Sequence, residues 1–88
     1  MIAMENKVLI KMIVLELDTS FDVFVPVNLT IYNVKKLVTK FISEITNFDV
    51  NSNYVLINKI NSRIYNNNEI VFNTDIRNAS EVILMKCG

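Results

Sequence analysis

The chain contains no histidine and no tryptophan, and only one cysteine, one proline and one glycine among its 88 residues. Without histidine, and with Cys87 as its single thiol, it cannot assemble a zinc site, a Ser/His/Asp triad or an internal disulfide. We therefore expect no metal, no cofactor and no enzymatic activity. One cysteine also fits a reducing compartment.

The chain also lacks an excess of either charge. Nine basic and nine acidic side chains give a formal net charge of zero, so we expect neither nucleic acid nor a membrane surface as a partner. The apolar run Val8–Leu17 is interrupted by Lys11 and Glu16, is too short to span a bilayer and has no signal-peptide cleavage site. We expect no direct membrane insertion and a cytoplasmic location, with protein partners recognised by shape and apolar contact.

The length allows one hydrophobic core. With 88 residues, 51% of them hydrophobic, the chain predicts a single domain over 1–88. Residues 1–6 are expected to form a frayed lead and 86–88 a short tail. Either Met1 or Met4 can be the start of translation.

One amphipathic helix is predicted within Pro26–Asn47. Its apolar residues occupy a single arc of about 140°. They are Ile31, Val34, Leu37, Val38, Phe41, Ile42 and Ile45. Thr30 is the expected N-cap, and Asn47, which tolerates a left-handed conformation, is the expected stop. Leu37 and Phe41 lie at the centre of the arc, so they should be buried, and Phe41→Ala should cost ~3–5 kcal/mol.

The remaining elements read as strands because apolar and β-branched residues recur with a period of two. The strands are expected at Lys7–Leu17, Phe21–Val25, Tyr54–Ile57, Ile64–Tyr65 and Glu81–Lys86. The order is therefore β-β-α-β-β-β, with Phe48 and Val50 packed inward after the helix. An α+β fold is expected, in which one helix packs on a mixed sheet and the first and last strands are parallel neighbours.

One face of this sheet is unusually apolar for a surface. Lys11 marks the odd positions of the first strand as outward, so its even positions should meet the helix. The same alternation places a candidate interaction surface on the outer face: Leu9, Ile13, Leu15, Phe24, Ile83 and Met85. A contiguous apolar patch of this kind marks an interaction site. We expect a homodimer or a dedicated partner there; a shifted register, or cover by the N-terminal residues, is the open alternative.

The order and spacing of these elements resemble the β-grasp, or ubiquitin-like, fold from Lys7 to Met85. A closer resemblance is to the YukD/EsaB family of small ubiquitin-like proteins of bacterial type VII secretion. Thr30–Lys35 resembles the helix-opening stretch of ubiquitin itself. The stretches that resemble the YukD/EsaB family are Phe21–Pro26, Phe48–Asn51, Asn68 with Val71–Phe72, and Ile76–Asn78. One departure is Ala79, which stands in the turn before the last strand where such proteins usually have glycine. We expect Asn78 to supply the positive φ there.

The resemblance implies a non-enzymatic accessory or regulatory protein of an Esx-type type VII secretion system. It would act in the bacterial cytoplasm by contact with protein partners, secretion-system components among them. The alternative is a ubiquitin-like sulfur carrier or modifier activated at its C-terminus. Such proteins use a Gly-Gly tail, whereas this sequence reads Lys86-Cys87-Gly88, so we expect the Gly88 carboxylate to stay unmodified. An interaction module of another system is the third interpretation.

Overall fold

The computed structural model describes residues 6–87, in which it places four strands and one α-helix. The elements are β1 Lys7–Val14, β2 Thr19–Pro26, α1 Ile31–Ile45, β3 Tyr54–Asn58 and β4 Glu81–Lys86, with short 3₁₀ helices at Leu15–Leu17 and Val71–Asn73. The predictions for the start of translation and for Gly88 lie outside the described residues.

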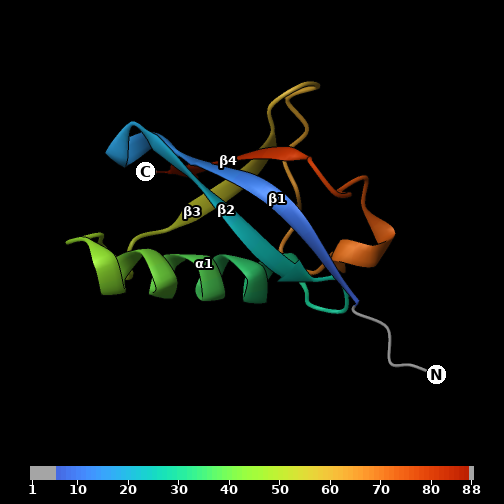
Figure 1. The fold of residues 1–88 in the computed structure, drawn as a ribbon, viewed down its shortest axis with the longest axis horizontal. Coiled ribbons are helices and arrows are strands. Elements are labelled where there is room, and N and C mark those ends of the chain that lie inside the picture. The colour runs from blue at the N-terminus through green and yellow to red at the C-terminus, as the bar shows by residue number, and fades with distance from the viewer. Residues whose placement is uncertain (1–5, 88) are drawn as a thin grey trace.

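The strands form one mixed sheet in the order β2-β1-β4-β3. β1 pairs antiparallel with β2 and parallel with β4, and β3 pairs antiparallel with β4. The first and last strands are therefore parallel neighbours, as predicted. Helix α1 lies across one face of this sheet (Figure 1). This is the predicted α+β architecture, a ubiquitin-like β-grasp fold.

The core lies between α1 and the inner face of the sheet. On β1 the even positions are buried and Lys11 is exposed, so the predicted choice of inner face is confirmed. The helix contributes the stripe Ile31, Val34, Val38 and Ile42. Tyr54, Leu56, Val82 and Leu84 of the other strands belong to the same cluster.

The helix begins as predicted and ends earlier. The Thr30 hydroxyl accepts the Asn33 N–H at 3.2 Å, which satisfies one of the unpaired amides of the first turn. At the other end the Thr46 hydroxyl donates to the Ile42 carbonyl and accepts the Phe48 N–H. Thr46 is extended, with φ −146°, so the chain leaves the helix without the left-handed stop predicted at Asn47.

The prediction that Leu37 and Phe41 are buried is wrong. Their exposed fractions are 45% and 42%. The sheet does not cover the whole apolar arc of the helix. β2 is an edge strand, and no described residue beyond β2 covers the side of α1 that carries Leu37 and Phe41. Thr39 is buried instead, which its hydroxyl permits by donating to the Lys35 carbonyl at 2.8 Å.

Two predicted strand segments are shorter than expected. β1 stops at Val14, and Leu15 lies in a 3₁₀ turn that Asp18 closes in the left-handed region, with φ 52°. In place of the predicted strand Ile64–Tyr65, Ile64 forms an isolated antiparallel bridge with Ile57.

Two loop predictions also fail. Phe48 is buried as expected, but Val50 is exposed. In the turn before β4 the positive φ falls on Ala79 itself, at 72°, and not on Asn78. The Asn78 side chain instead accepts the Leu9 N–H at 2.8 Å while the Ala79 N–H donates to the Leu9 carbonyl, also at 2.8 Å. This paired contact with β1 fixes which of the two residues takes the strained conformation.

Candidate interaction surface on the outer sheet face

The outer face of the sheet is built from rows of side chains that cross the strands. Directly paired residues point to the same side of a sheet, so the register defines each row. One row joins Ile13 of β1, Ile83 of β4 and Ile57 of β3, and Met85 lies opposite Val55 in the next row. These five half-buried residues form an apolar area that we call the central patch.

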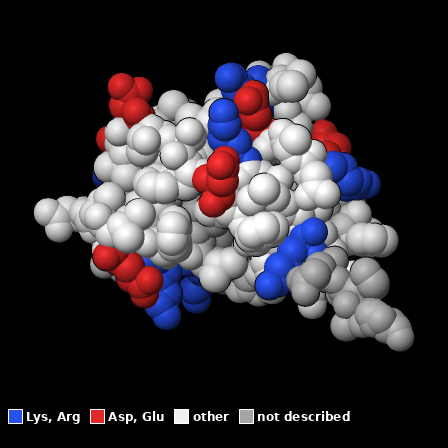
Figure 2. Space-filling view, in the orientation of Figure 1, with Lys and Arg blue, Asp and Glu red and all other residues white. Residues whose placement is uncertain are grey.

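A row of alternating charges borders the central patch. The register aligns Asp22 of β2, Lys11 of β1 and Glu81 of β4, and the Lys59 ammonium lies 3.6 Å from the Glu81 carboxylate. Figure 2 shows a band of alternating acidic and basic side chains with uncharged surface on both sides. The row sums to zero charge, so it can orient a partner without attracting polyanions.

On the far side of this row lie Leu9 and Phe24. They are paired across β1 and β2, with exposed fractions of 40% and 66%. The structure therefore brings Ile13, Ile83 and Met85 together and sets Leu9 and Phe24 apart from them. Leu15 is exposed but belongs to the 3₁₀ turn after β1, outside the strand rows.

Sequence reasoning missed the contribution of β3. Val55 and Ile57 alternate with buried Tyr54 and Leu56, so their outward direction was readable from the sequence. Their position beside Met85 and Ile83 was not, because it requires the register of β3 against β4. These two residues extend the central patch over three strands.

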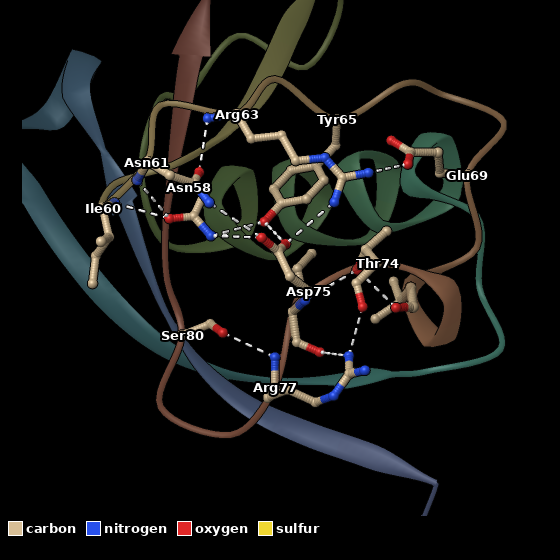
Figure 3. Close-up of polar contacts among 12 residues, drawn as sticks. Asn58, Ile60, Asn61, Arg63, Tyr65, Glu69, Thr74, Asp75, Arg77 and Ser80 are labelled. Atoms are coloured by element: carbon tan, nitrogen blue, oxygen red, sulfur yellow. Dashed lines mark hydrogen bonds and ion pairs between the residues drawn. The ribbon is translucent and has the colours of Figure 1, made fainter.

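A polar cluster holds the segment that follows β3 in place, and Figure 3 shows Asn58 and Asp75 meeting at the Tyr65 hydroxyl. Tyr65 donates to Asp75 Oδ1 at 2.5 Å and accepts from Asn58 Nδ2 at 3.1 Å. The Arg63 guanidinium lies over the Tyr65 ring and pairs with Asp75 at 3.6 Å and with Glu69. Each group thus has its partner inside the cluster.

These contacts shift the pKa values of Tyr65 and Asp75. Burial, followed by the hydrogen bond to Asp75, raises the pKa of Tyr65 to about 12. The same hydrogen bond is the main reason that the pKa of Asp75 lies below its ordinary value. Both shifts keep tyrosine protonated and aspartate ionised, the state that holds the cluster together. The arrangement stabilises a loop and leaves no free acid and base pair at the Tyr65 hydroxyl.

Two kinds of site are not found in the described part of the chain. Within residues 6–87 there is no group of three or more cysteine, aspartate or glutamate side chains arranged to hold a metal ion. No helix among these residues is both long and apolar enough to cross a membrane.

Comparison by sequence gives no relative: no family model and no curated protein matches the chain. Solved structures do match. The N-terminal ubiquitin-like domain of the 4931431F19Rik protein has a TM-score of 0.73 and 15% identity, covering 97% of this chain and 79% of that one. The ubiquitin-like domain of Plasmodium falciparum Dsk2 has a TM-score of 0.67 and 15% identity, covering 92% of this chain and 99% of that one.

A third similar structure belongs to a larger assembly. It is a chain of the MycP5-free ESX-5 inner membrane complex, with a TM-score of 0.68 and 10% identity. The match covers 94% of this chain but 21% of that chain. At these identities the likeness shows the fold alone: the described chain is a ubiquitin-like domain.

Proposed function

We propose that this ubiquitin-like domain is a non-enzymatic accessory or regulatory protein of an Esx-type type VII secretion system. It acts in the bacterial cytoplasm by contact with protein components of that system. The observation that carries the proposal is the joint order of the sequence stretches that resemble the YukD/EsaB family, from Phe21–Pro26 to Ile76–Asn78.

The outer sheet face supports a function through protein contact. The central patch is apolar over three strands, and the neutral charge row beside it gives a partner a fixed orientation. A chain of an ESX-5 inner membrane complex has a similar fold over 21% of its length, which is compatible with this role.

The alternative, a sulfur carrier or modifier, needs a C-terminal segment that enters an adenylating enzyme. In this chain Cys87, the residue after β4, is still attached to the body of the domain: its N–H donates to the Asn53 carbonyl at 2.9 Å. Incubation with an adenylating enzyme and ATP, followed by mass spectrometry, should leave the carboxylate of Gly88 unmodified. An acyl-adenylate or thiocarboxylate at Gly88 would favour the carrier or modifier role over the secretion role.

The test of the secretion role uses a host strain from which the gene is deleted. Export of small helical WXG-type substrates should fall and should be restored by the wild-type chain but not by Ile13→Lys, because a partner would have to desolvate the new charge. Asn33→Lys is the matched control: it adds the same charge at an exposed position of α1, away from the outer sheet face.

Circular dichroism must show that both variants are folded. If Ile13→Lys unfolds, Leu9→Lys replaces it, since Leu9 is more exposed on the same face. Unchanged substrate export in the deletion strain would refute the secretion role. Restoration by both lysine variants of the outer face would instead remove that face from the mechanism.

A further inference from the structure

Strand β2 presents backbone groups without a partner among the described residues. On β1 the Lys11 N–H donates to Ser80 and the Leu9 carbonyl accepts from Ala79, so odd residues direct their backbone groups toward β4. The even residues of β1 must then bond β2, at pairs such as Ile10 with Val23. The alternate residues of β2, namely Ser20, Asp22 and Phe24, therefore turn their N–H and carbonyl groups outward.

A groove runs beside this open edge. It has a volume of about 270 Å³. Its lining is Asp22, Val23 and Phe24 of β2 with Leu37, Val38 and Phe41 of α1. Consecutive side chains of a strand point to opposite faces, so three consecutive residues can border one groove only along the backbone edge. The unpaired edge and the exposed side of the helix thus form the two walls of one site.

Asp22 adds a charge to this site. Its side chain is exposed on the outer face, and no described residue forms a hydrogen bond or ion pair with its carboxylate. On a strand added beside β2, the residue opposite Asp22 would be placed for a cross-strand ion pair. The residues before and after it would point inward, toward Leu37 and Phe41.

The size of the apolar surface decides between a peptide and a second copy of the chain. Phe24, Leu37 and Phe41 are 66%, 45% and 42% exposed, which leaves on the order of 300 Å² of apolar side chain uncovered. A stable interface between folded proteins buries about 800 Å² on each side. The groove is too small for that, but backbone hydrogen bonds supply much of the affinity when an extended peptide joins a sheet edge.

We propose that this groove binds an extended peptide segment of a partner protein, which adds a fifth strand to the sheet beside β2. The segment has the pattern apolar, basic, apolar: its two apolar side chains enter the groove against Leu37 and Phe41, and its lysine or arginine pairs with Asp22. This site shares Asp22 with the charge row but lies outside the central patch, and it does not depend on the secretion role.

The experiment selects peptides from a phage-displayed library of random nine-residue sequences against the full chain. The expected consensus is a β-branched or aromatic residue, a basic residue and a second β-branched or aromatic residue. One selected peptide, labelled with fluorescein, is then titrated against variants by fluorescence anisotropy. Leu37→Asp should weaken its binding about tenfold or more, because the apolar residue of the peptide would desolvate a carboxylate.

Leu15→Asp is the matched control, since Leu15 has nearly the same exposed fraction, 48%, and lies outside the groove. It should leave the affinity unchanged. Methylation of the peptide amides that face β2 should abolish binding, whereas methylation of the alternate amides should not.

Three results would overturn the proposal: no enrichment of the apolar, basic, apolar pattern, equal affinity for Leu37→Asp and wild type, or no effect of either methylation. Analytical ultracentrifugation measures whether the chain forms a dimer through the groove. A concentration-dependent dimer that Leu37→Asp converts to monomer would assign the groove to a second copy of the chain instead.

Discussion

The two edge strands of the sheet, β3 and β2, differ in whether their outward backbone groups are hydrogen-bonded. At β3 the chain returns and pairs: the Asn58 N–H donates to Arg63 at 2.8 Å, and the Tyr65 N–H donates to Leu56 at 3.0 Å. At β2 the outward groups of Ser20, Asp22 and Phe24 have no such partner among the described residues. A bare edge is therefore not a general property of this sheet.

The difference shows what covers an edge in a small domain. The β3 edge is closed by a segment that cannot bury many apolar side chains and is held instead by the Tyr65 cluster and its ion pairs. Among residues 6–87, only the side of α1 lies beside the β2 edge, and apolar side chains there are exposed to water. Unpaired edges invite another strand, so the closed edge is protected and the open one is available.

The comparison predicts a large difference between two aromatic residues, one at each edge. Tyr65 is 3% exposed and Phe24 is 66% exposed. Tyr65→Ala should lower the free energy of unfolding by ~3–5 kcal/mol, enough to unfold a domain of this size. Phe24→Ala should cost less than about 1 kcal/mol. Urea denaturation at pH 7 measures both, and equal losses would contradict the assignment of open and closed edges.

The next largest loss of stability is expected on the side of α1 that lies beside the β2 edge. Phe41 is partly exposed and meets Phe21 edge-on, with ring centroids 5.9 Å apart. Phe41→Ala should therefore cost about 1–2 kcal/mol, from partial burial and one aromatic pair. Its neighbour Ile42 is fully buried, and Ile42→Ala should cost ~2–5 kcal/mol. A larger loss for Phe41 than for Ile42 in urea melts would show that this side of α1 is covered after all.

Removing one hydroxyl tests the closed edge more finely. Tyr65→Phe keeps the buried ring but loses the hydrogen bonds to Asp75 and Asn58, at a cost of about 1 kcal/mol at pH 7. The loss of both Asp75 and Asn58 as partners should also loosen residues 58–65, so hydrogen exchange of the Tyr65 amide should accelerate.

The same variant should alter the alkaline limit of stability. In the folded chain Tyr65 keeps its proton up to about pH 12, whereas an unfolded tyrosine loses it near pH 10. The stabilisation is therefore complete below pH 10 and is lost as the pH rises from 10 to 12. Wild type should lose more stability than Tyr65→Phe over this interval. Parallel pH profiles of the two proteins would contradict the raised pKa.

The smallest change in the free energy of unfolding is expected for Ala79, in the turn before the central strand β4. Ala79 holds a left-handed φ of 72°, which costs alanine about 1–2 kcal/mol but costs glycine nothing. After the greater chain entropy of glycine is subtracted, Ala79→Gly should stabilise the fold by about 0.5–1 kcal/mol. Thermal melts would detect this gain. Peptide binding at β2 should be unchanged, so a change in affinity would mean that the open edge depends on overall stability.

Much of this architecture was predictable because its causes are local. The cap at Thr30 and the alternation along β1 follow from one or two turns of chain, and both are confirmed. The largest errors occur where a distant segment decides. Leu37 and Phe41 belong to the apolar arc, but their exposure depends on which strand lies at the edge of the sheet.

The candidate surface was likewise predictable from the sequence only in its local features. The alternation in the sequence correctly separates inner from outer positions on β1. It could not show that the charge row through Lys11 separates Leu9 and Phe24 from the central patch, because that row forms only when strands far apart in the chain are set in register. Nor could it reveal the groove, whose two walls come from different elements.

By itself, then, the sequence determined the period of the main elements, the start of the helix at Thr30 and the inward face of β1, since these depend on side chains a few residues apart. The tertiary structure alone decided which strand edge is covered, which aromatic rings stay in water and which residue, Ala79 or Asn78, takes the positive φ. Each of those outcomes is set by contacts between residues distant in the chain, whose energies outweigh the local preferences that a sequence displays.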